Sequence, residues 1–416
     1  MHGGFSADIK DILPRPLTGC IRGLPSLART VSNPVFLIGM AVDNEIQSRQ
    51  TGLSGKRRTE TIIENYYRLN IMKIFAKIFL AFLILVIGLW QIPWLIAYFD
   101  TDQEDHPFTL YSCVTGDFAM IEHGGEDLTY TDRKGNIYTE SQFDSILPLF
   151  YARQLYSEGR FPDTLASKAV SLKEALEKNF FFNSHPSDIN RKTAGIHFLL
   201  ESESGRVDLE MPNDAFRITG RGIEFIEMES NSLDTSKSRI FTEAMKECGF
   251  AFPAKCVSGN PSTRKEYDEG YILTDHEGSL FHLKMVKGRP YIKKIDLPGN
   301  VRAEQAFITE FQNRSLIALF TDSEDRFYAV RMPGYETMEI GIQGKGFDPR
   351  RESILIVGNM FDWTIRISSD ERLSYYAVSS DDLSLLDMME CAVKKSRLHG
   401  LHFSSAEDKF VKPRFY

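Results

Sequence analysis

The stretch that decides the fold is TDHEGSLF at residues 274–281, because similar segments recur elsewhere in the chain. The related segments are TDRKGNIY at 131–138, TDSEDRFY at 321–328 and SDERLSYY at 369–376. Each has a Thr or Ser, then an Asp and a short polar turn, and ends on an aromatic residue. An Asp in this place can bond its own backbone two residues on and so start a turn. Apolar runs beside these turns predict four β-hairpins.

The spacing of these segments indicates a larger repeat. Thr274 and Thr321 are 47 residues apart, and Thr321 and Ser369 are 48 apart. Thr131 lies 143 residues before Thr274, an interval close to three such periods, which predicts three blades there. Periods of about 40–50 residues with several short strands are typical of propeller blades. We therefore predict a mainly β fold, a propeller-like array of roughly five to seven small antiparallel sheets. A plain β-meander with similar turns is the alternative.

Other segments have a helical pattern and predict short helical inserts between the sheets. They cover residues 148–156, residues 171–178 with a capping box at their start, and residues from about 236 to 248. The apolar stripe of the last one is expected to comprise Ile240, Phe241, Ala244 and Met245. The end of the chain, around residues 402–411, is expected to pair with residues 108–121 and close the array.

The uncharged run IFLAFLILVIGLWQIPWLIAYF at residues 78–99 predicts one transmembrane helix. Twenty-two helical residues span about 33 Å, and the hydrocarbon core of a bilayer is about 30 Å thick. Trp90, Trp94 and Tyr98 recur every four residues, as interfacial aromatic residues do. A cleaved signal peptide is the closest alternative, although no small-x-small cleavage site follows. A buried core helix is the other.

The charges on either side of this run predict its orientation. Residues 1–77 carry 11 Lys and Arg against 6 Asp and Glu, whereas residues 100–416 carry 38 against 51. Cytoplasmic flanks are enriched in basic residues, so we expect the N-terminus inside the cell. The large domain is then periplasmic, on a single-pass protein of the inner (cytoplasmic) membrane. The net charge of −8 argues against nucleic acid as a partner.

Three regions follow from these observations. Residues 1–71 are expected to be a disordered tail, or an extension that is not translated because the natural start is Met72. Residues 72–99 form the transmembrane anchor, and residues 100–416 form the β-rich domain outside the cytoplasm.

Candidate site residues are few. The repeated carboxylates Asp132, Asp275, Asp322 and Asp370 would gather at one face of a propeller, where they would bind cations or serve as acid and base in chemistry on a glycan. The alternative is that each only forms its turn. No phosphate-binding loop, serine nucleophile motif or zinc-binding helix is present, so we expect no cofactor, no metal and no enzymatic activity. Cys248 and Cys256 are either bridged or free thiols.

Eight short strings through the chain carry a resemblance to a known family. They are GDF at 116–118, FDSILPLFYARQL at 143–155, GRFPDTL at 159–165, SGRVD at 204–208, GIEFI at 222–226, EYDEGY at 266–271, GNMFDW at 358–363 and KFVKPRF at 409–415. Over about residues 72–416 the chain resembles the uncharacterised single-pass membrane proteins of Bacteroidota bacteria that are classed as a domain of unknown function. The resemblance implies genes near those of an ABC transporter, and hence a binding or scaffold protein that serves as an accessory transporter subunit. An extracytoplasmic glycan hydrolase or lyase is the alternative.

Overall fold

The structure is a computed structural model, and it divides into two compact units. Unit 1 comprises residues Met1–Trp90 and unit 2 residues Gln91–Tyr416. The described residues are 55–99, 107–124, 127–191, 193–203, 205, 208–369, 372–391, 402–403 and 413–414. Asp370 and residues 1–54 therefore lie outside them.

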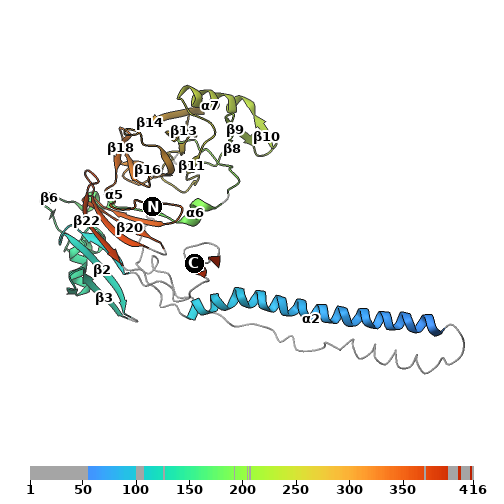
Figure 1. The fold of residues 1–416 in the computed structure, drawn as a ribbon. Helices are drawn as coiled ribbons and strands as arrows, with labels where there is room; N and C mark the ends of the chain where they lie inside the picture. The colour runs from blue at the N-terminus through green and yellow to red at the C-terminus, as the bar shows by residue number, and fades with distance from the viewer. Residues whose placement is uncertain are drawn as a thin grey trace. The chain divides into compact units, whose positions relative to one another are not determined.

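A single long helix, α2 (Gly55–Phe99), contains the predicted transmembrane run (Figure 1). Its stretch Glu64–Gln91 is long and apolar enough to cross a membrane, with a mean hydropathy of 2.4 and none of its apolar window buried in the protein. The helix begins well before Met72, so residues 55–71 are helical rather than part of an irregular tail. That segment contains no Pro or Gly after Gly55, so nothing interrupts the helix there.

Unit 2 is mainly β, as predicted, and its described residues form five antiparallel sheets of three to five strands. We number them in chain order as sheets 1 to 5. Sheet 1 contains β1 (Phe108–Ser112), β2 (Asp117–Gly124), β3 (Asp127–Asp132) and β4 (Ile137–Tyr138). Sheet 2 contains β8 (Asp214–Ile218), β9 (Ile223–Glu227) and β10 (Ser232–Asp234). Sheet 3 contains β11 (Cys256–Gly259), β12 (Tyr271–Thr274), β13 (Leu280–Val286) and β14 (Arg289–Ile295).

The last two sheets follow the same up-and-down order. Sheet 4 contains β15 (Ala303–Ile308), β16 (Leu316–Asp322), β17 (Phe327–Arg331) and β18 (Glu336–Glu339). Sheet 5 contains β19 (Ser353–Gly358), β20 (Asp362–Ser368), β21 (Leu373–Ser379) and β22 (Leu385–Cys391), with β7 (Phe180–Ser184) paired to β19. Its central strands are buried on both faces, as the near-continuous apolar sequence of β21 requires.

Contacts between sheets run in the order 1, 5, 4, 3, 2, so the first sheet of the chain packs beside the last. The backbone N–H of Tyr111 in β1 donates to Thr364 Oγ1 in β20 over 2.8 Å. Trp363 of sheet 5 belongs to the same apolar cluster as Leu319 of sheet 4. This is the propeller-like array that the repeat predicts.

The interval of 143 residues before Thr274 does not contain three blades. One sheet of its own, sheet 2, lies between β4 and β11, and the rest of that interval forms inserts and β7. The helical inserts are α3 (Glu140–Ile146), α4 (Ala152–Ser157), α5 (Leu172–Lys178), α6 (Pro186–Asn190) and α7 (Thr235–Glu247), and β5 (Thr164–Leu165) pairs with β6 (Lys168–Ala169). The helices predicted at 171–178 and 236–248 are confirmed, but Ile240 is exposed rather than part of the buried stripe of α7.

The expected pairing of residues 402–411 with residues 108–121 falls mostly outside the described residues, which near the end of the chain are 402–403 and 413–414. Where this region is described, β23 (His402–Phe403) pairs with β24 (Pro413–Arg414) instead. The added strand of sheet 5 is β7, which comes from the middle of the chain. Its Phe180 stacks on Phe311 at a centroid distance of 4.5 Å, and its Phe182 meets Phe307 edge-on at 5.4 Å. Aromatic burial therefore holds β7 between sheets 4 and 5.

Candidate functional site

Three of the four predicted carboxylates occupy turns with the same hydrogen-bond pattern. Asp275 lies between β12 and β13, and its Oδ1 accepts from the N–H groups of Glu277 (3.0 Å) and Ser279 (2.8 Å). Asp322 lies between β16 and β17 and accepts from Glu324 and Arg326, each at 2.9 Å. Each turn closes with a backbone bond from the residue three positions on, which has a positive φ. These residues are Gly135, Gly278 and Asp325.

Asp132 has the same local bond but lies elsewhere in its sheet. Its turn is the third hairpin of sheet 1, whereas Asp275 and Asp322 lie in the second hairpins of their sheets. Successive hairpins of an antiparallel meander lie at opposite ends of the strands. Asp132 is therefore not equivalent to the other two, and the alignment of the repeats is shifted there by one strand.

Each of these carboxylates is occupied within its own turn. Asp132, Asp275 and Asp322 are 5%, 0% and 2% exposed. Burial alone would raise the pKa of Asp132, but hydrogen bonds from Asn136 and Tyr138 outweigh it, and the pKa is lowered. Arg326 Nη2 lies 2.6 Å from Asp322 Oδ2. The geometry explains all three as turn-forming residues; a ligand-binding role for them and for Asp370 stays a prediction.

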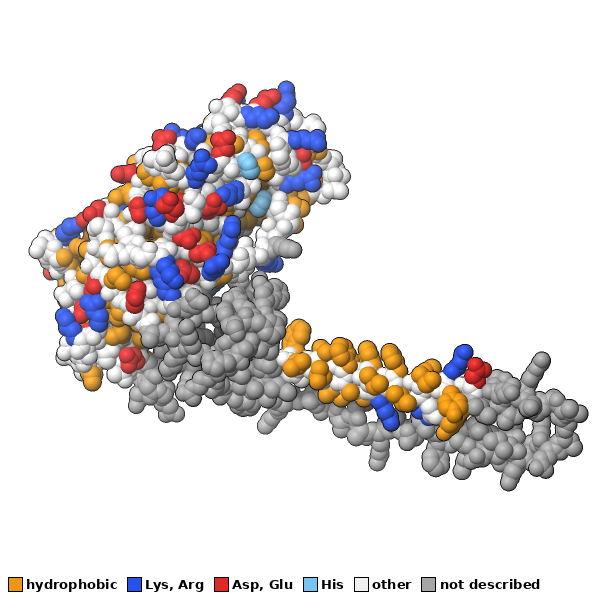
Figure 2. Space-filling model, in the orientation of Figure 1, with side chains coloured by type: hydrophobic (Ala, Val, Ile, Leu, Met, Phe, Trp, Pro, Cys, Tyr) orange, Lys and Arg blue, Asp and Glu red, His pale blue; other side chains and the backbone are white. Residues whose placement is uncertain are grey.

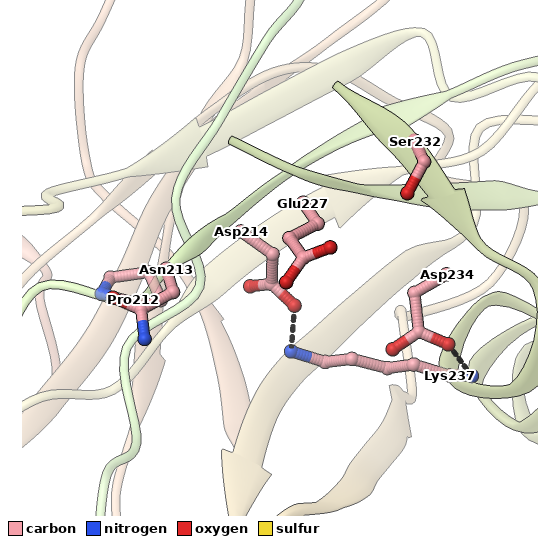
Figure 3. A pocket seen from close by; sticks show the side chains of 7 residues that line it. All are labelled: Pro212, Asn213, Asp214, Glu227, Ser232, Asp234 and Lys237. Carbon is pink, nitrogen blue, oxygen red and sulfur yellow. Dashed lines mark hydrogen bonds and ion pairs between the residues drawn. The ribbon is translucent and has the colours of Figure 1, made fainter. Parts of the chain in front are cut away.

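A pocket of about 400 Å³ lies where sheet 2 meets the start of α7 (Figure 3). Asp214 at the start of β8 faces Glu227 at the end of β9 across the strand pair, and Ser232 of β10 faces Glu227 in turn. The pocket is lined by Pro212, Asn213, Asp214, Glu227, Ser232, Asp234 and Lys237.

Lys237 sets the electrostatics of this pocket. Its Nζ lies 2.6 Å from Asp214 Oδ2 and 4.3 Å from the centre of the Phe225 ring, so both a carboxylate and an aromatic face hold the ammonium. Asp234 caps α7, its Oδ1 accepting from the backbone N–H of Lys237 over 2.9 Å. Asp214 Oδ1 is buried and has no hydrogen-bond partner among the described residues. The lining of the pocket thus contains three carboxylates and one ammonium, a balance that suits a cationic group.

Sequence reasoning missed this pocket. The only indication of the pocket in the sequence is the set of acidic residues between Ile223 and Asp234, and these do not form a recognised motif. Their convergence depends on the register that places Asp214 opposite Glu227, which only the folded sheet reveals.

Two groups of charged side chains join neighbouring sheets. Between sheets 3 and 4, Lys265 Nζ lies 2.6 Å from Asp268 Oδ1 and 2.5 Å from Glu310 Oε1. We call these three residues the buried clasp, because their side chains are 9%, 2% and 5% exposed.

Between sheets 1 and 5, Arg133 makes a comparable junction. Its guanidinium meets Asp387 through two bonds of 3.1 and 2.6 Å and lies 2.9 Å from Asp117 Oδ1. We call these three residues the open clasp, because Arg133 is 38% exposed. Both clasps resemble structural ion pairs rather than a catalytic centre.

Cysteines and metal-binding groups give no further site in the described part of the chain. Cys248 and Cys256 are free thiols; the Sγ atoms face the carbonyls of Ile292 and Ala306, respectively. Across the described residues, no group of three or more His, Cys, Asp or Glu side chains is placed to hold a metal ion.

Comparison with solved structures finds matches of low similarity, among them a β-propeller domain. The β-propeller domain of Cps50 (Swd1) from Myceliophteria thermophila gives a TM-score of 0.26 and 8% identity, covering 52% of this chain and 62% of that one. Hydrazine synthase of Kuenenia stuttgartiensis gives a TM-score of 0.26 and 10% identity, and the match covers 51% of this chain and 54% of that one. PorZ, a component of the type-IX secretion system of Porphyromonas gingivalis, gives a TM-score of 0.22 and 11% identity, and the match covers 70% of this chain and 32% of that one. The chain thus spans less than two thirds of each.

Comparison with curated protein sequences finds no match. A family model matches residues 108–378, which begin at β1 and end within β21. The matched range therefore contains the pocket, the buried clasp and all but the last strand of the five sheets. The chain belongs to the family described as domain of unknown function DUF4857.

Proposed function

We propose that this protein is a membrane-anchored binding or scaffold protein whose β-rich domain lies outside the cytoplasm. The observation that carries the proposal is the apolar surface of α2. Within Glu64–Gln91, Leu80, Phe82 and Leu85 are 58–59% exposed, and none of the apolar window is buried among the residues that the structure describes. Figure 2 shows this apolar surface along the helix. So large an apolar surface in water is unfavourable, and a bilayer is the solvent that suits it.

The dimensions and flanks of the helix support the same reading. Twenty-eight helical residues extend about 42 Å, enough to cross a hydrocarbon core of about 30 Å with some tilt. Lys73 and Lys77 lie within this stretch, just before the uncharged residues 78–99, and Asp100, Asp102, Glu104 and Asp105 follow the helix. This asymmetry favours an N-terminus in the cytoplasm.

Membrane extraction tests the anchor. We expect the full-length protein to stay in the membrane pellet at alkaline pH and to be released by detergent. A variant carrying Leu80→Arg and Leu85→Arg should lose membrane insertion, because each Arg at a helix centre costs about 2.5–3.5 kcal/mol. The matched control carries Leu233→Arg and Leu386→Arg, which replace leucines of the domain that are 46% and 48% exposed. Extraction of the wild-type protein by alkali alone would contradict the proposal.

A reporter enzyme that is active only in the periplasm tests the orientation. Fused after Tyr416, it should be active, and fused before Met1 it should be inactive. The reverse pattern would place the domain in the cytoplasm.

The partner we propose is an ABC transporter subunit, on the strength of the family resemblance. A domain of several small sheets suits the role because it holds loops rigidly on a broad surface. The pocket at sheet 2 adds a place where a cationic side chain of a partner fits, since its carboxylates outnumber its single ammonium.

Affinity purification from native membranes in mild detergent, followed by mass spectrometry, tests the partner. Near-stoichiometric recovery of transporter subunits would support the proposal, and recovery of the protein alone would contradict it. A variant with Asp214→Asn and Glu227→Gln tests whether the pocket contributes to binding of the transporter subunits. Asp163→Asn, at an exposed carboxylate outside the pocket, is the matched control.

A further inference from the structure

A buried carboxyl group lies at the junction of sheets 1 and 5, at the start of β20. Asp362 is 1% exposed. Its Oδ1 accepts from Asn359 Nδ2 over 3.0 Å, and its Oδ2 is buried with no hydrogen-bond partner from any residue that the structure describes. No cation pairs with this carboxylate in the part of the chain that the structure describes. A charge in such a place is strongly unfavourable, whereas a neutral carboxyl is tolerated.

The groups that face Asp362 do not compensate a charge there. From sheet 1 its neighbours are the Cys113 thiol and the Tyr111 hydroxyl. Burial and the proximity of Asp362 raise the pKa of Cys113 to about 12, and the same two causes raise the pKa of Tyr111, so both are neutral near pH 7. Lys168, the cation over the Phe361 ring, pairs with Asp381 at 3.2 Å. Arg331 from β17 donates to the carbonyls of Ser380 and Asp381.

Asp362 also lies close along β20 to the contact between the two sheets. Two residues further along β20, Thr364 Oγ1 accepts from the Tyr111 N–H of β1. Asp117 and Asp387 of the open clasp also act on Tyr111, so the junction already holds two carboxylates around Arg133. A third negative charge, without a cation of its own, opposes the packing of β1 on β20.

We propose that Asp362 makes the contact between sheets 1 and 5 sensitive to pH, so that sheet 1 loosens as the pH rises towards neutrality. The step is loss of the carboxyl proton to solvent, after which the carboxylate becomes hydrated only when β1 moves away. This inference does not depend on the membrane anchor or on the transporter partner.

The direction of the pH dependence follows from the coupling between ionisation of Asp362 and opening of the junction. Burial raises the pKa of Asp362 from 3.8 to about 7. The closed junction therefore binds more protons than the opened one between these values, and closure is favoured at low pH. The equilibrium constant for opening should rise about tenfold per pH unit from pH 5 to 7 and then level off.

Hydrogen exchange on the full-length protein in detergent tests this inference. Amide exchange in β1, corrected for the intrinsic effect of pH, should increase about 100-fold between pH 5 and pH 8. Asp362→Asn should abolish this dependence, whereas Asp381→Asn, at an exposed carboxylate near the same junction, should keep it. An unchanged pH dependence in Asp362→Asn, or none in the wild type, would overturn the proposal.

An infrared titration of the wild-type protein covers the case in which Asp362→Asn does not fold. The absorption band of a protonated buried carboxyl should disappear between pH 6 and pH 8. If no buried carboxyl titrates in that interval, the proposal is wrong.

Discussion

The buried and open clasps place the same kinds of charges at two junctions between sheets, but they differ in exposure. Lys265 of the buried clasp is 9% exposed, whereas Arg133 of the open clasp is 38% exposed. In both, one cation bridges two carboxylates on different loops or strands. The comparison separates the chemistry of an ion pair from the effect of its surroundings.

The surroundings should decide the energetics. A buried cation and its partners have lost their hydration, so removing one member leaves the others without compensation. At the open clasp, water and salt replace part of what is lost. The carboxylates of the buried clasp also accept from neutral groups: Ser202 Oγ donates to Asp268 over 2.6 Å and the Glu269 N–H to Glu310 over 2.8 Å. These bonds hold the carboxylates in place whether or not Lys265 is present.

The largest effect is expected for Lys265→Met. This change leaves Asp268 and Glu310 buried beside each other without a cation, and it should lower the free energy of unfolding by about 3–5 kcal/mol. Thermal and denaturant unfolding of the full-length protein in detergent measure it. Lys265→Met combined with Glu310→Gln should cost less than the two changes added together. A loss below about 1 kcal/mol for Lys265→Met would mean that burial does not distinguish the clasps.

An intermediate effect is expected for Asp275→Ala, which removes a carboxylate that is buried but paired with backbone N–H groups only. The N–H groups of Ala251, Glu277 and Ser279 lose their acceptor. Unsatisfied buried donors cost about 1–3 kcal/mol, and we expect a loss in that range. Asp275→Asn, which keeps one acceptor oxygen, should recover part of it. Equal losses in the two variants would contradict this account of the turn.

The turns were predictable from sequence, and the clasps were not, for a physical reason. The carboxylates of Asp275 and Asp322 accept hydrogen bonds from the residues two and four positions further on. Each turn therefore lies within one short segment that contains both the acceptor and its donors. Lys265 meets Glu310 across 45 residues, and Arg133 meets Asp387 across 254. Such pairs depend on which sheets become neighbours, and a local pattern does not contain that information.

In other parts of the molecule too, only features that depend on local sequence were predicted. The apolar run of α2 was evident because hydropathy is a local property, although its helical start at Gly55 was missed. The strand β7 was missed because FFFNS is too short to reveal that it pairs with β19. The pocket and Asp362 became visible only with the register of β8 against β9 and the position of β1 beside β20.

A smaller effect is expected for Arg133→Gln at the open clasp. In this variant Asp117 still accepts a hydrogen bond from the N–H of Phe118 over 2.8 Å, and Lys134 Nζ remains 3.6 Å from its Oδ2. The carboxylate of Asp117 therefore still has a cation near it. We expect a loss of about 1 kcal/mol. Because part of the interaction is exposed, the difference between Arg133→Gln and the wild type should shrink when salt is raised from about 0.05 to 1 M. The effect of Lys265→Met should not change in the same titration.

The smallest effect is expected for Lys255→Met, which tests burial at a single junction. Lys255 pairs with Glu304 and so joins sheets 3 and 4, as the buried clasp does, but the two side chains are 37% and 31% exposed. Its removal should cost at most about 0.5–1 kcal/mol, because solvent compensates Glu304 once the ammonium is gone. Unfolding of Lys255→Met and Lys265→Met is measured under the same conditions. Both variants replace a Lys by Met at the junction of sheets 3 and 4, so they differ in the exposure of the ion pair. If the two variants lost the same stability, position between the sheets rather than exposure would set the strength of both ion pairs.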